Sequence, residues 1–83
     1  MKPEIVKRAS DAKRLREDEA FAAFVQEVRN EQIAVFLNPA TSSEDREKAH
    51  QMVLAVHQIE LRLKSAEDAL RFEQQKGQHR GSD

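Results

Sequence analysis

The chain of 83 residues contains no cysteine, tryptophan or tyrosine, and only two glycines and two prolines. The lack of cysteine excludes disulfides, thiolate nucleophiles and thiolate metal ligands. No apolar run approaches the roughly 18 residues of a membrane span, and residues 1–10 lack the apolar stretch of a secretory signal peptide. We therefore expect no membrane partner and no secretion through a signal peptide.

The residues that are abundant favour helices over strands. Alanine, glutamate, glutamine, lysine, arginine and leucine recur throughout the chain and are good helix formers, whereas the few β-branched residues do not alternate with polar ones. Hydrophobic residues make up 39% of the chain, and 11 of them are alanines, so only 21 larger apolar side chains remain for a core. A single small domain, residues 1–83, with so thin a core is expected to be an all-α homo-oligomer.

Charge is unevenly distributed along the chain. Residues 1–16 carry six basic side chains against two acidic ones, a net charge of +4, whereas residues 17–47 carry eight acidic side chains against two basic ones, a net charge of −6. This basic N-terminal arm contains the candidate partner or phosphate contacts Lys7, Lys13 and Arg14. The arm lacks the aromatic residues that stack on bases, so a solvated helix face, or an arm that binds an acidic protein surface, is favoured over nucleic-acid binding.

Helical periodicity predicts a first helix over about residues 4–37. Its apolar residues are separated mainly by three or four positions, as on one face of a helix. The step from Leu15 to Phe21 is six residues, however, and Asp18 between them can act as an N-cap. The sequence leaves open whether the helix is kinked or broken near Asp18.

The segment LNPATSSEDRE, residues 37–47, predicts a turn rather than a binding loop. Pro39 disfavours helical geometry in Asn38, which ends the first helix. Thr41, Ser42 and Ser43 are three candidate N-caps for a second helix. Because a connection of about five residues usually joins antiparallel neighbours, we expect a helical hairpin.

The second helix, about residues 43–76, carries a heptad pattern typical of coiled coils. Its a and d positions are Ala49, Met52, Val56, Ile59, Leu63, Ala66 and Leu70. Gly77 is expected to close this helix, which leaves residues 77–83 as a flexible polar tail.

Folding the chain back about residue 40 or 41 places apolar residues of the two helices opposite one another. Residue i then faces approximately residue 81 − i, which brings Val28 near Val53 and Leu15 near Ala66. The residues expected in the helix–helix core or in an oligomer interface are Phe21, Phe24, Val28, Met52, Val56, Ile59, Leu63 and Leu70. The pattern does not say whether the heptad seam faces the first helix or another chain.

No arrangement of polar residues predicts catalysis or metal binding. His50 and His57 would lie about 10.5 Å apart along a helix, too far to share a metal ion. The acidic clusters at residues 17–19 and 44–47 fall where helices are expected to begin, where negative charge is stabilised by the helix dipole. Gly-rich phosphate loops and catalytic triad motifs are missing from the sequence. We therefore expect no catalytic residues, metal, cofactor or small-molecule substrate, and no enzyme.

Part of the chain resembles a family of small all-helical proteins encoded among the virion-assembly genes, in the head and packaging region, of tailed bacteriophages and prophages. The similar features are AKRL (residues 12–15), an acidic step before Phe21, Arg29 ahead of the turn, and S-x-E-D-R-E-x-A-H (residues 42–50) before the heptad helix. Glu19 stands where such proteins often have proline. The resemblance covers about residues 11–70 and implies a structural or assembly role in a phage particle or its packaging machinery, without any catalytic residue.

Three functional hypotheses follow from these observations. The leading one is a non-enzymatic structural or assembly protein of a phage virion or packaging apparatus, located in the host cytoplasm or the virion, which contacts itself and other virion proteins through its helices. The second is a nucleic-acid-binding packaging accessory protein that uses the basic arm. The third is an adaptor that is partly disordered alone and folds on a partner.

Overall fold

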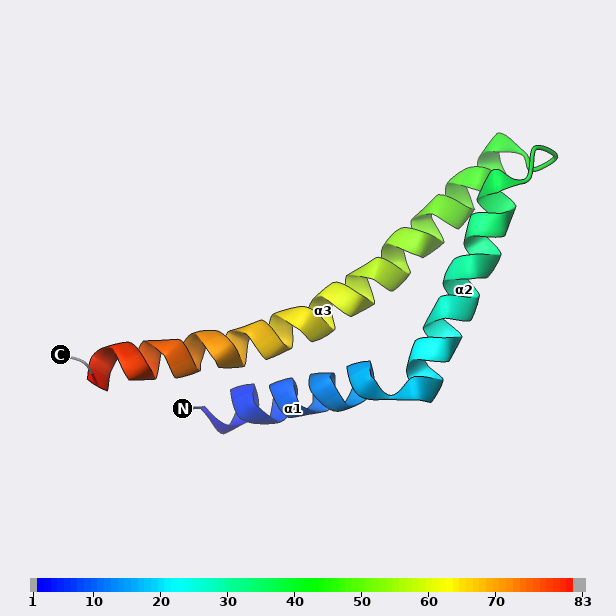
Figure 1. The fold of residues 1–83 in the computed structure, drawn as a ribbon. Coiled ribbons are helices and arrows are strands. Elements are labelled where there is room, and N and C mark those ends of the chain that lie inside the picture. The colour runs from blue at the N-terminus through cyan, green and yellow to red at the C-terminus, as the bar shows by residue number, and fades with distance from the viewer. Residues whose placement is uncertain (1, 82–83) are drawn as a thin grey trace.

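The computed structural model describes the backbone of residues 2–81 and the side chains of residues 2–77. Its elements are α1 (Pro3–Glu17), α2 (Glu19–Leu37) and α3 (Ser43–Gly81), coloured from blue to red in Figure 1. The all-α prediction is confirmed, since the described residues contain no strand.

Asp18 separates α1 from α2, so the first predicted helix is broken rather than kinked. Its backbone is extended, with φ −72° and ψ 118°, and its N–H donates to the carbonyl of Leu15 at 3.1 Å to end α1. Its carboxylate accepts the N–H of Phe21 at 2.8 Å and so caps α2. One aspartate therefore ends one helix and begins the next.

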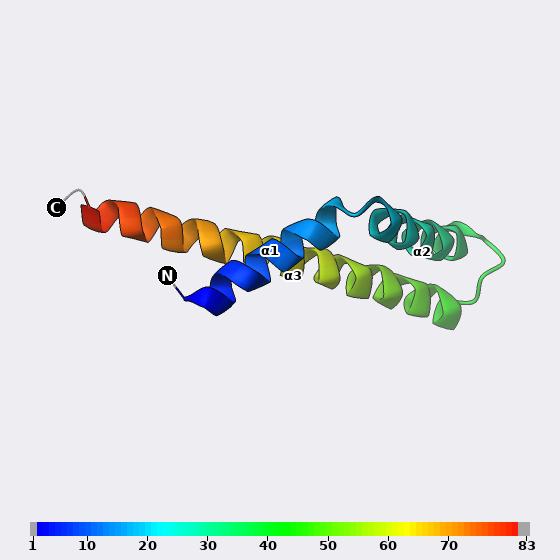
Figure 2. The same ribbon diagram turned by 90° about the horizontal axis from the view of Figure 1, so that it is seen from below.

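The two helices before the turn lie one after the other along α3. Both pack against α3 and make little contact with each other, and the bend between them is visible in Figures 1 and 2. The molecule measures 63 × 25 × 17 Å. The arrangement thus differs from a two-helix hairpin, because the part of the chain before the turn consists of two helices, α1 and α2, that each pack on α3 separately.

The turn between α2 and α3 is organised by Asn38 and Ser42. The Asn38 side-chain oxygen accepts the N–H of Ala40 at 2.9 Å, and its carbonyl accepts the N–H of Thr41 at 3.0 Å. The Ser42 hydroxyl accepts the N–H of Asp45 at 3.1 Å. Among the three candidate N-caps, the structure therefore selects Ser42, and the segment acts as a turn.

Arg46 ties the turn together in a way that helix-capping patterns did not predict. Its guanidinium donates to the carbonyl of Phe36 at 3.1 Å, to that of Asn38 at 3.4 Å and to that of Thr41 at 3.3 Å. These carbonyls lie at the end of α2 and in the turn, where intrahelical partners are missing. A side chain from the first turns of α3 therefore donates hydrogen bonds to backbone carbonyls at the end of α2 and in the turn.

The predicted end of the second helix near Lys76 is wrong. The helix α3 continues through Gly77 to Gly81, and nothing lies within 4 Å of where a Cβ on Gly77 would be. A single glycine inside a helix costs only about 1 kcal/mol relative to alanine, and no packing contact there requires the chain to turn. The expected polar tail is helical as far as Gly81, and residues 82 and 83 lie outside the described residues.

The core of the described chain is small. Its buried hydrophobic residues are Ala9, Ala12, Ala49, Val56 and Ala66. Alanines allow two helix backbones to approach closely, but each contributes little apolar area to hydrophobic stabilisation.

The observed helix pairing differs from the simple fold-back. Arg29 contacts Glu60, whereas a sum of 81 would place Arg29 near residue 52, about two helical turns away. In α1 the pairing is close to the expectation, since Arg16 contacts Glu67 and Leu15 lies near Ala66. The break at Asp18 explains the difference, because it lets α1 and α2 take separate registers on α3.

Candidate protein-interaction surface

The face that α3 turns toward α1 and α2 follows the a and e positions of the heptad rather than a and d. The buried or half-buried residues of α3 are Arg46, Ala49, Val53, Val56, Glu60, Leu63, Ala66, Glu67, Leu70 and Glu73. The d residues Met52 and Ile59 are instead 46% and 50% exposed, and only the d residue Ala66 is buried. The seam that the sequence predicts is therefore rotated away from the other two helices.

The core candidates consequently fall into two groups. Val56 is buried, and Phe21, Val28, Leu63 and Leu70 are half-buried. The other three, Phe24, Met52 and Ile59, lie outside the core of a single chain, and Phe24 is 66% exposed. Their apolar surface is accessible to another molecule.

Two acidic e residues of α3 form ion pairs with the shorter helices. Glu67 accepts two hydrogen bonds from Arg16 of α1, at 2.8 and 2.9 Å, and Glu60 pairs with Arg29 of α2. The hydrogen bonds from Arg16 lower the pKa of the Glu67 carboxyl below its ordinary value, and the same pair raises the pKa of Arg16. Each short helix is thus joined to α3 by one arginine–glutamate pair.

Two contacts mark one side of the α2–α3 pair. Arg29 reaches Glu60 there, and the ring of Phe36 lies 6.3 Å from that of His50, between centroids, at a tilt of 40°. These contacts occupy the same flank of both helices, since antiparallel helices bring equivalent flanks together.

The opposite side of this pair carries exposed apolar residues. Residues advance by about 100° around a helix, which places Met52 and Ile59 on the flank of α3 away from both contacts. The same spacing places Phe24 and Val35 on the corresponding flank of α2, and all four are exposed. We call this side of the molecule, with the groove described next, the open face.

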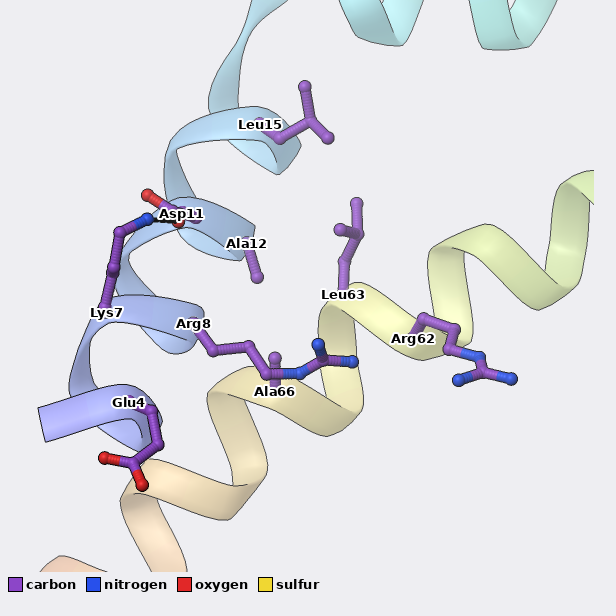
Figure 3. A pocket seen from close by; sticks show the side chains of 9 residues that line it. All are labelled: Glu4, Lys7, Arg8, Asp11, Ala12, Leu15, Arg62, Leu63 and Ala66. Atoms are coloured by element: carbon purple, nitrogen blue, oxygen red, sulfur yellow. Dashed lines mark hydrogen bonds and ion pairs between the residues drawn. The ribbon is translucent and has the colours of Figure 1, made fainter. Parts of the chain in front are cut away.

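A groove between α1 and α3 continues the open face along α3. It has a volume of about 470 Å³ and includes Ala66, which shares the d position of Met52 and Ile59. In Figure 3, Leu63 points from α3 toward Leu15 on α1, so the groove has an apolar floor.

Two arginines border this groove. Arg8 reaches from α1 toward α3, and Arg62 projects from α3 at the other edge (Figure 3). Both also line the adjoining hollow beside Ser65. Among the described side chains neither arginine has an ion-pair partner, whereas Arg16, Arg29 and other basic residues do. Lys7, Glu4 and Asp11 line the groove as well, so three basic and two acidic side chains leave it with a net charge of +1.

The three predicted phosphate contacts are not gathered at one place. Lys7 and Arg14 both pair with Asp11, at 2.6 and 2.8 Å. The hydrogen bond from Lys7 lowers the pKa of the Asp11 carboxyl. Lys13 lies on another side of α1, where it lines a hollow with Glu67. The structure therefore divides the basic arm between separate surfaces and partly neutralises it.

The remaining polar clusters have structural roles in the described part of the chain. Asp18 caps α2, and Glu44 and Asp45 lie in the first turn of α3. No group of three or more histidine or acidic side chains within the described residues could hold a metal ion. Across the same residues, no helix combines the length and the hydropathy needed to cross a bilayer.

Sequence reasoning missed Arg8 and Arg62 as a pair, because they belong to different helices and only the fold brings them together. The charge excess of residues 1–16 was the one available signal for Arg8.

Comparison with known proteins identifies no relative: no family model, no curated protein and no solved structure matches this chain.

Proposed function

We propose that this protein is a non-enzymatic structural or assembly protein that acts through helix–helix contacts with other protein chains, including copies of itself. The supporting observation is the distribution of its apolar side chains. Its buried hydrophobic residues are four alanines and one valine, whereas twelve larger hydrophobic residues of the described part are exposed. Large apolar surfaces left exposed on a small protein commonly mark interaction sites.

The size of the surface supports the same proposal. The accessible area is 6710 Å², whereas a compact monomer of 9.5 kDa would expose about 5,000 Å². The radius of gyration is 18.1 Å, against about 12 Å for a compact chain of this length. A partner chain would cover part of this additional surface.

The biological setting that we propose is the assembly of a tailed-phage particle, as a virion or packaging component in the virion or the host cytoplasm. The support for this setting is the resemblance of residues 11–70 to small helical proteins of the head and packaging region. A protein that links other chains by helix packing fits such a role without requiring a reaction.

Sedimentation velocity at micromolar concentration, combined with far-UV circular dichroism, tests the proposal. We expect a helical oligomer whose thermal unfolding midpoint rises with protein concentration, because subunit association stabilises the folded state. A helical monomer with a cooperative, concentration-independent transition would contradict the proposal. Weak helicity that appears only with a partner would instead support an adaptor that folds on binding.

A second candidate function is nucleic-acid binding through the basic arm. The observation in its favour is that Lys7, Lys13 and Arg14 are all exposed on α1. It predicts binding that weakens steeply with salt and is lost when all three are replaced by glutamate. A gel shift that is negative at about 50 mM salt would exclude this candidate.

A further inference from the structure

We infer that the open face binds the open face of a second copy of this chain, with Phe24 of each copy inserted in the α1–α3 groove of the other. In this arrangement the acidic side chains beside Phe24 oppose Arg8 and Arg62 of the second copy. The inference rests on the proposed function, since it identifies the surface and the partner of the helix–helix contact.

The open face carries a projecting side chain, Phe24, and a hollow, the groove between α1 and α3. Phe24 is the most exposed aromatic residue of α2, at 66%. The groove, about 470 Å³, is floored by Ala12, Leu15, Leu63 and Ala66. An aromatic side chain that enters an apolar pocket is a common centre of a protein interface.

The charges around the projection and the hollow are complementary. Glu27 and Glu31 follow Phe24 by three and seven residues, so all three lie along one stripe of α2. Within the described side chains, neither glutamate has an ion-pair partner, and neither does Arg8 or Arg62. A two-fold axis that brings Phe24 to the groove places opposite charges together twice, once at each end.

The area available agrees with this pairing. A standard interface buries about 800 Å² of accessible surface on each partner. The accessible surface of this chain is roughly 1,700 Å² larger than that of a compact monomer of the same mass, so such an interface would cover about half of the difference. Exposed Met52 and Ile59 lie on the same face and would be covered together with Phe24. A second copy is therefore an occupant that matches the face in apolar area and in charge.

A charge exchange between two variants tests the inference. The first variant carries Arg8→Glu and Arg62→Glu, and the second carries Glu27→Arg and Glu31→Arg. Each alone places like charges against each other at both ends of the contact, so we expect its self-association to weaken at least tenfold. In an equimolar mixture opposite charges face each other again at both ends, and we expect a 1:1 heterodimer by sedimentation equilibrium.

A third variant provides the matched control. Lys64→Glu with Lys76→Glu changes the net charge by the same amount as the first variant. Lys64 lies on the other side of α3, beside Glu60 and Glu67, so we expect this variant to associate like the wild type. Circular dichroism verifies that each variant is helical, and Phe24→Ala, which changes no charge, should also weaken self-association.

The outcomes separate the inference from the proposed function. If the wild type associates but both charge variants associate equally well, or if the mixture forms no heterodimer, the inference is wrong while a helix–helix function stands. If the wild type is a folded monomer, both fail. Loss of association in each variant, its return in the mixture and its persistence in the control support the inference.

Discussion

The two helices that pack on α3 differ in a way that their compositions do not suggest. The basic helix α1 is rich in charge, yet it buries Ala9 and Ala12 against α3. The helix α2 is richer in apolar residues and contains three of the four phenylalanines, yet it buries no residue. Within a single chain, the more apolar of the two helices is therefore the one that buries less of its apolar surface.

This difference separates two kinds of apolar contact. Alanines at the α1–α3 contact let the backbones approach and complete a small local core. Larger side chains on α2 and on the flank of α3 remain exposed, which is the expected arrangement where a second chain completes the packing. The alanines between α1 and α3 serve the fold of one chain, whereas the exposed side chains of α2 belong to the surface through which we propose that a second chain binds.

Val56→Asp should have the largest effect on the fold. Val56 is buried, and an unpaired carboxylate there loses its hydration, so the free energy of unfolding should fall by about 3 kcal/mol or more. Ile59→Asp, one turn away at an exposed position, should weaken the self-association that we propose while helicity persists. Urea unfolding and sedimentation velocity at fixed protein concentration distinguish the two, and equal losses of helicity would contradict this assignment.

Ala12→Leu should disturb the α1–α3 contact specifically. Three additional carbon atoms in a site that alanine fills force the helices apart, at a cost of about 1–3 kcal/mol. The matched change Ala23→Leu, at an exposed position of α2, should leave the free energy of unfolding nearly unchanged. Similar urea midpoints for the two variants would show that α1 is not closely packed on α3.

Asp18→Ala should have a smaller effect at the junction of α1 and α2. Removal of the carboxylate leaves the N–H of Phe21 without its cap, which costs about 1 kcal/mol. Asp18→Asn retains an oxygen acceptor and should be close to the wild type in thermal denaturation. If alanine and asparagine behave alike, the capping bond contributes nothing to stability.

Acidification should have the smallest effect of these four changes, a weaker contact between α1 and α3. The pKa of Glu67 is lowered by Arg16, so the pair's contribution is complete above the ordinary glutamate pKa of about 4.3 and is lost as the pH falls through the lower, folded-state pKa. The stability difference between wild type and Glu67→Gln, measured by urea unfolding, should shrink toward zero with acidification. A difference that is independent of pH would contradict this role.

Local sequence signals predicted much of the secondary structure. Asp18 and Ser42 both cap helices by local hydrogen bonds, and Pro39 lies just beyond the end of α2. The exception was Gly77, whose weak helix-breaking tendency does not interrupt α3. Short-range hydrogen bonds of this kind depend on residues close in sequence, and so a single sequence contains most of the information.

The candidate surface was less predictable, because it depends on the direction that each helix turns toward its neighbours. A heptad repeat identifies a stripe, but the d and e positions on either side of a are only about 100° apart around the helix. The observed seam uses Glu60 and Glu67 at e, held by Arg29 and Arg16, whereas hydrophobicity alone pointed to Met52 and Ile59 at d. The inward-facing edge is thus the one whose glutamates contact arginines far away in the sequence, and no spacing within α3 encodes those contacts.

Arg46 and the pair of Arg8 and Arg62 illustrate the same limit. Each acquires its surroundings from residues on another helix or across the turn, and no spacing within one helix encodes that contact.

The sequence by itself determined that the chain is helical, that it reverses near Pro39, and that its apolar residues are too few and too small for a large core. These properties follow from local propensity, turn chemistry and composition. Only the tertiary structure decided that α1 and α2 take separate registers on α3, and that Phe24, Met52 and Ile59 face outward. The physical reason is that a stripe on one helix becomes inside or outside only when the neighbouring helices are placed against it.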